Sequence, residues 1–491
     1  MNIRDITRLI VPLTVYFLEE TMLFNSLAFA IFLPIVFLLF WAMPQKHRWI
    51  VLLLSSYYFY MSWNVKYVVL ILFTTAVSFV TALLLEKTQQ KEKRKRYLVL
   101  ALCACLGVLF VFKYFNFFTG TVAAVLQRFA LPIHPVTLTL MLPVGISFYT
   151  FQTLSYVIDV YRGEVKAERH FGRYAAFISF FPQLVAGPIE RTENLLPQIN
   201  KKEFHFSYEN ASYGLKLMAW GFFKKLVIAD NLGVYVDQIF NDVTYYRGFS
   251  VLLAVLFFTL QIYCDFSGYS DIAIGTARLF DIRLMTNFKS PYFSGSIREF
   301  WTRWHISLST WFRDYVYIPL GGNRVSRFRN AVNLMVTFLV SGLWHGAAWT
   351  FVVWGGVHGA LQIVEKTLLG KRKLPKPLIF MLVALAWVFF RADSMSDAFY
   401  VFTHLFTGIA APKEYFLAPM SDFDWTVKQV CFLAAPVLLL AVYDHAALTC
   451  DPIEKISRLP GAGRWVVYYV FLLAVILLAS FNAQEFVYFQ F

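Results

Sequence analysis

The sequence has few charged residues for its length. Of its 491 residues, 15% are Asp, Glu, Lys or Arg and 58% are hydrophobic, whereas about 25% of an average soluble domain is charged. This composition excludes an ordinary soluble protein. Because the apolar runs are as long as a helix that crosses a bilayer, and longer than the strands of a membrane barrel, the sequence predicts an all-α polytopic membrane protein.

Cysteine is also scarce. The five cysteines show no CxxC spacing, so we expect neither a disulfide framework nor a zinc site, and no other metal. We expect no signal peptide of the usual form, because Asp5, Glu19 and Glu20 interrupt the first apolar segment. Residues 1–21 are expected to be an upstream extension or an interfacial helix, and residues 22–491 to form a single membrane domain.

The excess of positive charge predicts how the chain is oriented in the membrane. A formal net charge of +14 does not indicate nucleic acid, because Lys and Arg of a membrane protein collect in its cytoplasmic loops. The basic loops 44–48 and 86–96 therefore lie inside, and alternating crossings give about twelve in all, with both chain ends outside. Segment 177–199 is apolar but broken by Pro182 and Pro188, and we expect it to be re-entrant or interfacial.

Two Trp-His pairs are the most unusual feature of the sequence. They are Trp304-His305, in a basic and aromatic segment, and Trp344-His345, in an apolar run. Ionisable residues inside a membrane segment mark functional sites by default, because burying a polar group without a partner costs about 1–3 kcal/mol. The alternative is a packing histidine held by a backbone carbonyl, which is the commoner case for a single histidine. Two pairs in a Gly-rich, aromatic setting favour a functional site.

The apolar segment 261–275 contains four polar residues, Asp265, Ser267, Ser270 and Asp271. They either line a substrate path or form a polar surface for helix packing, since small and hydroxyl residues hold membrane helices together. The sequence leaves both interpretations open.

Several motifs together resemble one family. In chain order they are FFPQLVAGPIER (180–191), QIYCDFSGYSDIAIG (261–275), FWTRWHISLSTWFRDYVYIPLGGNR (300–324), SGLWHGAAWTFVVWGGVHG (341–359), WVFFRADSMSDA (387–398) and FVYFQF (486–491). In these motifs, which span most of the chain, the sequence is similar to the membrane-bound O-acyltransferase superfamily. The similarity is greatest to the bacterial branch that contains the alginate O-acetylation protein. One short motif would be weak evidence, whereas this many in the family's order are specific.

The resemblance implies a fold and a reaction. It implies a ring of tilted helices around a central funnel in the bacterial cytoplasmic membrane. Acetyl-coenzyme A would enter from the cytoplasm and the acyl acceptor from outside. It also implies that His345 is the catalytic histidine, while His305 stands where the family has His, Asn or Asp. His358 matches no catalytic position and is expected to pack between helices.

The chemistry of histidine agrees with these implied roles. An imidazole with a pKa near about 6.5 can take a proton from an acceptor hydroxyl at neutral pH. We therefore expect His345 to be the general base, and His305 to orient it or to stabilise the oxyanion. A histidine that is itself acylated is less favoured. The guanidinium groups of Arg298, Arg303 and Arg313 could bind the coenzyme's phosphates, although ordinary cytoplasmic positive charge explains each of them equally well.

The segment FVYFQF (486–491) has two interpretations. Aromatic residues at a membrane boundary commonly anchor a helix in the interface. The segment also resembles the terminal acyl-accepting peptide of related cell-wall acylation systems. In that case the Tyr488 phenol, with a pKa near about 10, loses its proton more easily than a sugar hydroxyl and takes the acetyl group. The resemblance then implies a partner, an extracytoplasmic acyltransferase of the SGNH-hydrolase type, which delivers the group to an exported polysaccharide or cell-wall polymer.

Other functions stay open at this point. Intramembrane His and Asp residues also suit a transporter or channel, although the sequence shows no internal repeat of the transporter kind. A scaffold for polysaccharide secretion would leave the Trp-His pairs without a role. Among acyltransferases, D-alanyl and longer acyl groups are alternatives to acetyl, because the shape of the cavity selects the donor.

Overall fold

The computed structural model describes residues 21–131, 134–185, 187–370, 372–480 and 486–487. Within these ranges the regular secondary structure is helical and no strand is present, which confirms the predicted all-α class. Residues 1–20, which are expected to form an upstream extension or an interfacial helix together with residue 21, lie outside the described residues.

The chain forms two compact units. The first consists of Met1–Leu215 with Ile272–Met285, and the second of Lys216–Asp271 with Thr286–Phe491. The expectation of a single membrane domain stays a prediction.

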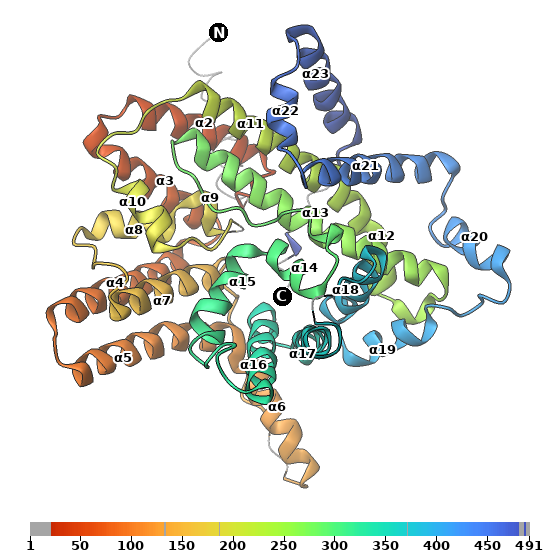
Figure 1. The fold of residues 1–491 in the computed structure, drawn as a ribbon, viewed down its shortest axis with the longest axis horizontal. Helices are drawn as coiled ribbons and strands as arrows, with labels where there is room; N and C mark the ends of the chain where they lie inside the picture. The colour runs from red at the N-terminus through yellow and green to blue at the C-terminus, as the bar shows by residue number, and fades with distance from the viewer. Residues whose placement is uncertain (1–20, 132–133, 186, 371, 481–485, 488–491) are drawn as a thin grey trace, which may run out of the picture. The chain divides into compact units, whose positions relative to one another are not determined.

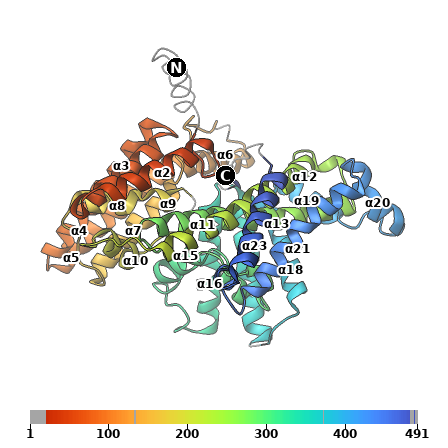
Figure 2. The ribbon, with the colours of Figure 1, turned by 90° about the horizontal axis from the view of Figure 1, so that it is seen from above.

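The first unit is built mainly from the helices before residue 200. They are α2 (Leu27–Ala42), α3 (Arg48–Met61), α4 (Val68–Lys87), α5 (Lys91–Leu109), α6 (Phe115–Arg128), α7 (Ile146–Arg162), α8 (Phe171–Ser179), α9 (Phe181–Leu184) and α10 (Thr192–Ile199). Helices α4, α5 and α7 lie side by side, as Figure 1 shows. Helix α8 packs against both α3 and α4 (Figure 2).

Helix α4 shows how hydroxyl residues pack these helices. Its buried residues include Ile71, Thr74, Thr75 and Ser78, at the spacing of one helical face. Thr75 Oγ1 donates to Ile71 O of the preceding turn at 2.6 Å, so the buried hydroxyl is satisfied within its own helix. Ser78 Oγ accepts a hydrogen bond from the Tyr174 hydroxyl of α8 at 2.7 Å. Small polar side chains can therefore form this interface without leaving polar groups unsatisfied.

The broken segment 177–199 forms the end of α8 and the short helices α9 and α10. None of these three helices is long enough to cross a bilayer, as the interrupted apolar pattern predicts. Gly187 is required at the break, because a Cβ there would lie 2.3 Å from Gln183 Cα.

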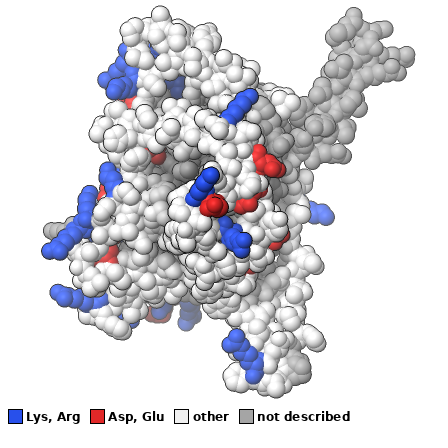
Figure 3. Space-filling view, turned by 90° about the vertical axis from the view of Figure 1, so that its right-hand side faces the viewer, with Lys and Arg blue, Asp and Glu red and all other residues white. Residues whose placement is uncertain are grey.

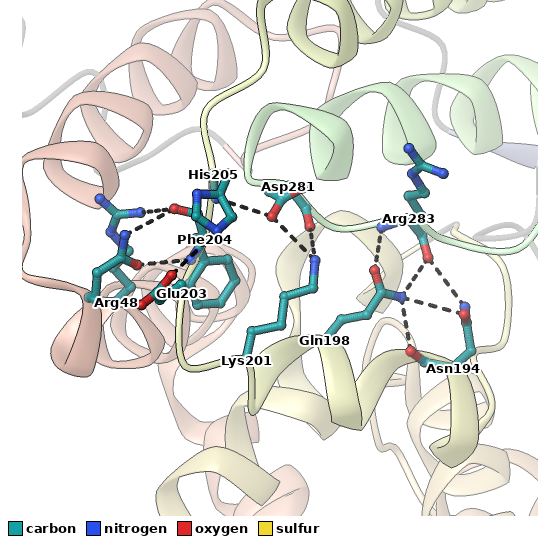
Figure 4. Close-up of polar contacts among 10 residues, drawn as sticks. Arg48, Asn194, Gln198, Lys201, Glu203, Phe204, His205, Asp281 and Arg283 are labelled. Atoms are coloured by element: carbon teal, nitrogen blue, oxygen red, sulfur yellow. Dashed lines mark hydrogen bonds and ion pairs between the residues drawn. The ribbon is translucent and has the colours of Figure 1, made fainter.

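Polar contacts join the loops of the first unit (Figure 4). The Arg48 guanidinium donates to Phe204 O at 3.1 Å. Lys201 forms an ion pair with Asp281 at 3.3 Å. These contacts tie the start of α3 and the segment that follows helix α13 (Phe249–Leu279) to the loop after α10.

The second unit contains most of the later helices. They are the second part of α11 (Tyr208–Phe222), the π-helical turn η4 (Phe223–Ala229), α12 (Asp230–Phe240), the first part of α13 (Phe249–Leu279), α14 (Ile297–Arg303), α15 (Ile306–Phe312), α16 (Arg327–His345), α17 (Trp349–Val364), α18 (Lys376–Arg391), α19 (Met395–His404), α20 (Pro412–Asp422), α21 (Val427–Ala446), α22 (Pro452–Ser457) and α23 (Gly461–Leu478). Their buried apolar and aromatic side chains form one large core.

Helices α16 and α17 pack closely through glycines. A Cβ on Gly342 would lie 2.2 Å from Phe351 O, and a Cβ on Gly355 would lie 2.2 Å from Phe338 O. Such close approach of two backbones through small residues is typical of membrane helices. It holds the end of α16, which carries Trp344-His345, against α17.

Five helical segments of the described residues are long and apolar enough to cross a membrane. They are Val65–Lys87, Lys91–Arg128, Phe249–Leu279, Val427–Ala446 and Gly461–Leu478. On the face drawn in Figure 3, uncharged side chains cover most of the surface and charged ones stand in small groups. The larger number of crossings expected from the basic loops stays a prediction, because helices such as α17, with 16 residues, are shorter than a full span.

Candidate active site

His305 lies at a break between two short helices. Helix α14 ends at Arg303 and α15 begins at Ile306, and His305 between them has φ 42° and ψ 55°, in the left-handed region. Holding a residue other than glycine in this region costs about 1–3 kcal/mol of backbone strain, and strained residues are concentrated at functional sites. The side chain of His305 is fully buried.

Asn287 fixes the imidazole of His305. The Asn287 Oδ1 accepts the backbone N–H of Ser307 at 3.3 Å and the Ser307 hydroxyl at 2.9 Å, and it lies 3.1 Å from His305 Nδ1. Because a backbone N–H only donates, Oδ1 is the acceptor end of this amide, and His305 Nδ1 must carry the proton. Asn287 is itself held in place, since its backbone carbonyl accepts a hydrogen bond from the backbone N–H of Ile306 at 2.9 Å. The lone pair of the imidazole is therefore on Nε2.

Burial keeps His305 neutral. Desolvation lowers the pKa of its imidazole from the ordinary value of 6.5 to about 3. At neutral pH the Nε2 atom of His305 is consequently a hydrogen-bond acceptor.

His345 ends helix α16 beside His305. The two imidazole rings lie 6.5 Å apart, centroid to centroid, and His345 is 4% exposed. The rings of Trp344, Trp354 and Phe390 lie 4.9, 5.0 and 5.4 Å from the His345 ring. The structure thus brings the histidines of both Trp-His pairs into one buried site with aromatic walls, which we call the histidine site.

His358 of α17 has a different environment. Its Nδ1 accepts a hydrogen bond from Trp301 Nε1 at 3.3 Å. The Phe300 ring stacks on it at 6.3 Å and the Trp354 ring meets it edge-on at 5.0 Å. This is the arrangement of a histidine that packs helices together.

Asp265 lies on α13 and is buried together with a lysine. Its Oδ1 is 2.7 Å from Lys225 Nζ, and its Oδ2 accepts the backbone N–H of Val487 at 2.7 Å. The preceding residue, Phe486, packs against Phe266, and Phe266 meets the His305 ring at 4.6 Å. Segment 486–487 is thus anchored next to the histidine site. Tyr488, the expected acyl carrier, lies outside the described residues.

The three arginines expected to bind phosphate have different surroundings. Arg303 pairs with Glu299 and Arg313 pairs with Asp314, both at 2.7 Å. Arg298 is exposed on α14.

Sequence reasoning missed the residues that support the site. Asn287 stands in a segment with no recognisable pattern. Lys224 and Lys225 are both buried and ion-paired, with Asp271 and with Asp265 respectively. Two lysines and two aspartates in apolar segments were the signal, because charges inside a membrane pair with one another. Among the described residues, no group of three or more His, Cys, Asp and Glu side chains could hold a metal ion.

Comparison with known proteins decides the family. The membrane-bound O-acyltransferase family matches residues 167–392. A probable alginate O-acetylase of Pseudomonas putida is 36% identical over 96% of this chain and 100% of its own length. The chain belongs to the membrane-bound O-acyltransferase family. A probable alginate O-acetylase of Azotobacter vinelandii is 38% identical over 88% of this chain and 87% of its own, and a peptidoglycan O-acetyltransferase of Helicobacter pylori is 37% identical over 77% and 78%.

The family membership makes the protein a multi-pass membrane O-acyltransferase, as the motifs predict. The part that matches the family contains His305, His345, Asp265 and Asn287. Segment 486–487 lies beyond that part but is anchored to Asp265 within it.

Proposed function

We propose that this membrane-bound O-acyltransferase moves acetyl groups from cytoplasmic acetyl-coenzyme A across the bacterial cytoplasmic membrane. The groups would serve the O-acetylation of an exported polysaccharide or cell-wall polymer. The observation that carries the proposal is the buried pair of His305 and His345, with rings 6.5 Å apart. The relatives named above support acetyl as the group, since the names of all three refer to O-acetylation. Those names cover two different polymers, alginate and peptidoglycan.

The two histidines have separate roles in this proposal. His345 takes the proton from the acceptor hydroxyl as its oxygen attacks the thioester carbonyl, and a positioned general base of this kind is worth roughly 10²–10⁴-fold. The C–S bond then breaks, and the protonated His345 returns the proton to the leaving thiolate. His305 has its lone pair on Nε2, so in its neutral form it can accept a hydrogen bond but cannot donate one from that atom. This tautomer supports an orienting role for His305 over that of oxyanion donor.

The aromatic walls of the histidine site support the same chemistry. Trp344, Trp354 and Phe390 bury the imidazole of His345, and a site that excludes water strengthens electrostatic interactions with developing charge. Exclusion of water also protects the thioester from hydrolysis. Arg298, exposed on α14, is our candidate for contact with the coenzyme's phosphates.

The hydroxyl that first receives the acetyl group is, in our proposal, the phenol of Tyr488. What supports this is the position of the two residues before it. Phe486 packs against Phe266, which contacts His305, and Val487 is bonded to Asp265. From an acetylated Tyr488 on the outer side of the membrane, an extracytoplasmic acyltransferase of the SGNH-hydrolase type would carry the group to the polymer.

The test uses purified protein in nanodiscs with acetyl-coenzyme A that is radiolabelled in its acetyl group. Wild type, His345→Ala and Tyr488→Phe are compared for label bound covalently to the protein. Label in the wild type that both substitutions abolish supports transfer to Tyr488 with the help of His345. Label lost only in His345→Ala assigns the acyl group to another residue.

Two further outcomes concern the reaction itself. Transfer to an added acceptor without labelled protein would support the acetyltransferase and overturn the acyl-tyrosine step. Neither label, transfer nor coenzyme binding would contradict the proposal and favour a transporter.

A further inference from the structure

A buried carboxylate of α13 holds a backbone amide near the far end of the chain. The Oδ2 atom of Asp265 accepts the N–H of Val487 at 2.7 Å, and the two residues are 1% and 4% exposed. A hydrogen bond to a charged acceptor is roughly twice as strong as one between neutral groups. Among the described contacts, this hydrogen bond ties the backbone of Val487 to helix α13.

Asp265 is paired with a lysine of a neighbouring segment. Lys225 Nζ lies 2.7 Å from Asp265 Oδ1 and 2.8 Å from Asp230 Oδ1, and all three side chains are 1% exposed. Taken alone, a buried carboxylate would be neutralised, because an isolated charge in a low-dielectric interior is very costly. The ion pair with Lys225 occupies Oδ1 of Asp265 and leaves Oδ2 to accept the N–H of Val487.

A local irregularity of the backbone makes this arrangement possible. Lys225 stands in the π-helical turn η4, between α11 and α12, and such turns are frequent at functional sites. Gly268 of α13 lets the two segments approach, because a Cβ there would lie 2.8 Å from Gly221 O and 3.2 Å from Lys225 N.

The anchored segment adjoins the histidine site on one side. The Phe486 ring lies 4.6 Å from the ring of Tyr269 and 5.7 Å from that of Phe266. Phe266 in turn meets the ring of His305 at 4.6 Å. The anchored segment is therefore separated from His305 by a single aromatic ring.

We infer that Asp265, which is paired with Lys225, is a positioning residue that fixes segment 486–487 next to the histidine site. This inference rests on the proposed function for its consequence, which is acetyl transfer to Tyr488. The anchoring itself is independent of any reaction.

The first measurement is the rate of hydrogen–deuterium exchange at the amide of Val487 in the full-length protein in nanodiscs. It is followed by mass spectrometry with fragmentation that resolves single amides. Asp265→Ala removes the acceptor, while Lys225 keeps Asp230 as an ion-pair partner. We expect exchange at Val487 to rise at least about tenfold in Asp265→Ala. Asp265→Asn, which keeps a neutral acceptor, should give an intermediate rate.

The matched control is Asp271 on the same helix. Asp271 pairs with Lys224, the neighbour of Lys225, at 2.7 Å. The same two substitutions at Asp271 remove a carboxylate from a comparable ion pair and should leave exchange at Val487 at the wild-type rate. Unchanged exchange at Val487 in Asp265→Ala would overturn the inference, and so would an equal increase in the Asp271 variants.

The second measurement is covalent acetyl label in the same variants. Loss of label in Asp265→Ala with partial recovery in Asp265→Asn supports the positioning role, provided that the Asp271 variants keep their label. Label at the wild-type level in Asp265→Ala, with Val487 released, overturns it. If wild type carries no label on Tyr488 while exchange at Val487 responds as expected, the acyl-tyrosine step fails and the anchoring by Asp265 stands.

Discussion

The Oδ1 atom of Asn287 lies 3.1 Å from Nδ1 of His305 and determines which nitrogen of that ring carries the proton. The backbone N–H of Ser307 makes the assignment, because it can only donate to that same oxygen. Asn287, which the family resemblance does not single out, thus determines the tautomer of His305, which the resemblance does single out.

Asn287→Ala should lower the rate of acetyl transfer on the order of 100-fold, because a misoriented catalytic group costs about that much. Ser307→Ala removes one of the two donors from Ser307 to Asn287 and should have a smaller effect in the same direction. Ser309→Ala is the control, since the Ser309 hydroxyl bonds only to Trp304 O at 3.1 Å among the described contacts. The rates are measured per amount of folded protein. Equal rates for the Asn287 and Ser309 variants would show that the amide does not position His305.

Arg298→Gln should raise the KM for acetyl-coenzyme A about tenfold with little change in kcat, as expected for the loss of a charge-assisted bond to phosphate. Arg313→Gln is the matched control, because Arg313 already pairs with Asp314 at 2.7 Å. Initial rates at several coenzyme concentrations give both constants. If the two variants change KM equally, the effect belongs to general positive charge and Arg298 has no special contact.

Gly355→Ala should destabilise the protein by about 1–3 kcal/mol, because the added methyl group overpacks a tight interface. Its Cβ would lie 2.2 Å from Phe338 O of α16. Gly356→Ala changes the next residue of the same helix, where the nearest atom is Leu339 Cδ2 at 3.5 Å, and should be tolerated. Melting temperatures of the detergent-solubilised variants distinguish the two. A Gly356→Ala variant as unstable as Gly355→Ala would mean that the helix tolerates no alanine there, whatever the space.

Glu190 should make the stability of the protein fall as pH rises. Its side chain is fully buried and burial raises the pKa of its carboxyl from 4.5 to about 7, although Met285 N–H donates to it at 2.5 Å. A carboxyl group with a raised pKa in the folded state binds more protons there than in the unfolded state between these two pH values. The contribution to stability is therefore largest below about pH 4.5 and is lost by about pH 7, by an amount on the order of a few kcal/mol.

Glu190→Gln removes this dependence. The melting temperature of the variant should therefore rise relative to that of the wild type when the pH is raised from about 5 to about 8. Glu193→Gln, at an exposed position of the same helix α10, is the control and should follow the wild type. A Glu190→Gln variant that loses stability relative to wild type at the higher pH would contradict the raised pKa.

The sequence predicted the parts of this site whose signal is chemical. Two Trp-His pairs in an apolar protein pointed to a functional site, and the structure places His305 and His345 together. The helical class followed from the length of the apolar runs. Such signals can be read without knowledge of the fold, because they depend on the type of residue and not on its contacts in the folded structure.

The supporting residues could not be predicted because their roles depend on backbone geometry. Asn287 matters only because a left-handed turn at His305 presents Nδ1 to it. Lys225 reaches both Asp230 and Asp265 from a π-helical turn, and one extra residue in that turn shifts every later side chain away from the 3.6-residue period. Hydrophobic periodicity carries no signal for either feature.

The most direct test of the account is the initial rate of coenzyme A release from acetyl-coenzyme A by the protein in nanodiscs, with the same substitution at each of its three fully or almost fully buried histidines. The rate of His345→Gln should be at least about 100-fold lower than that of the wild type, as expected for the loss of a general base. The rate of His305→Gln should also be strongly reduced. His358→Gln, which changes only a packing histidine, should keep most of its rate per amount of folded protein. A His345→Gln variant that releases coenzyme A at the wild-type rate would contradict the central claim that the histidine site performs the transfer.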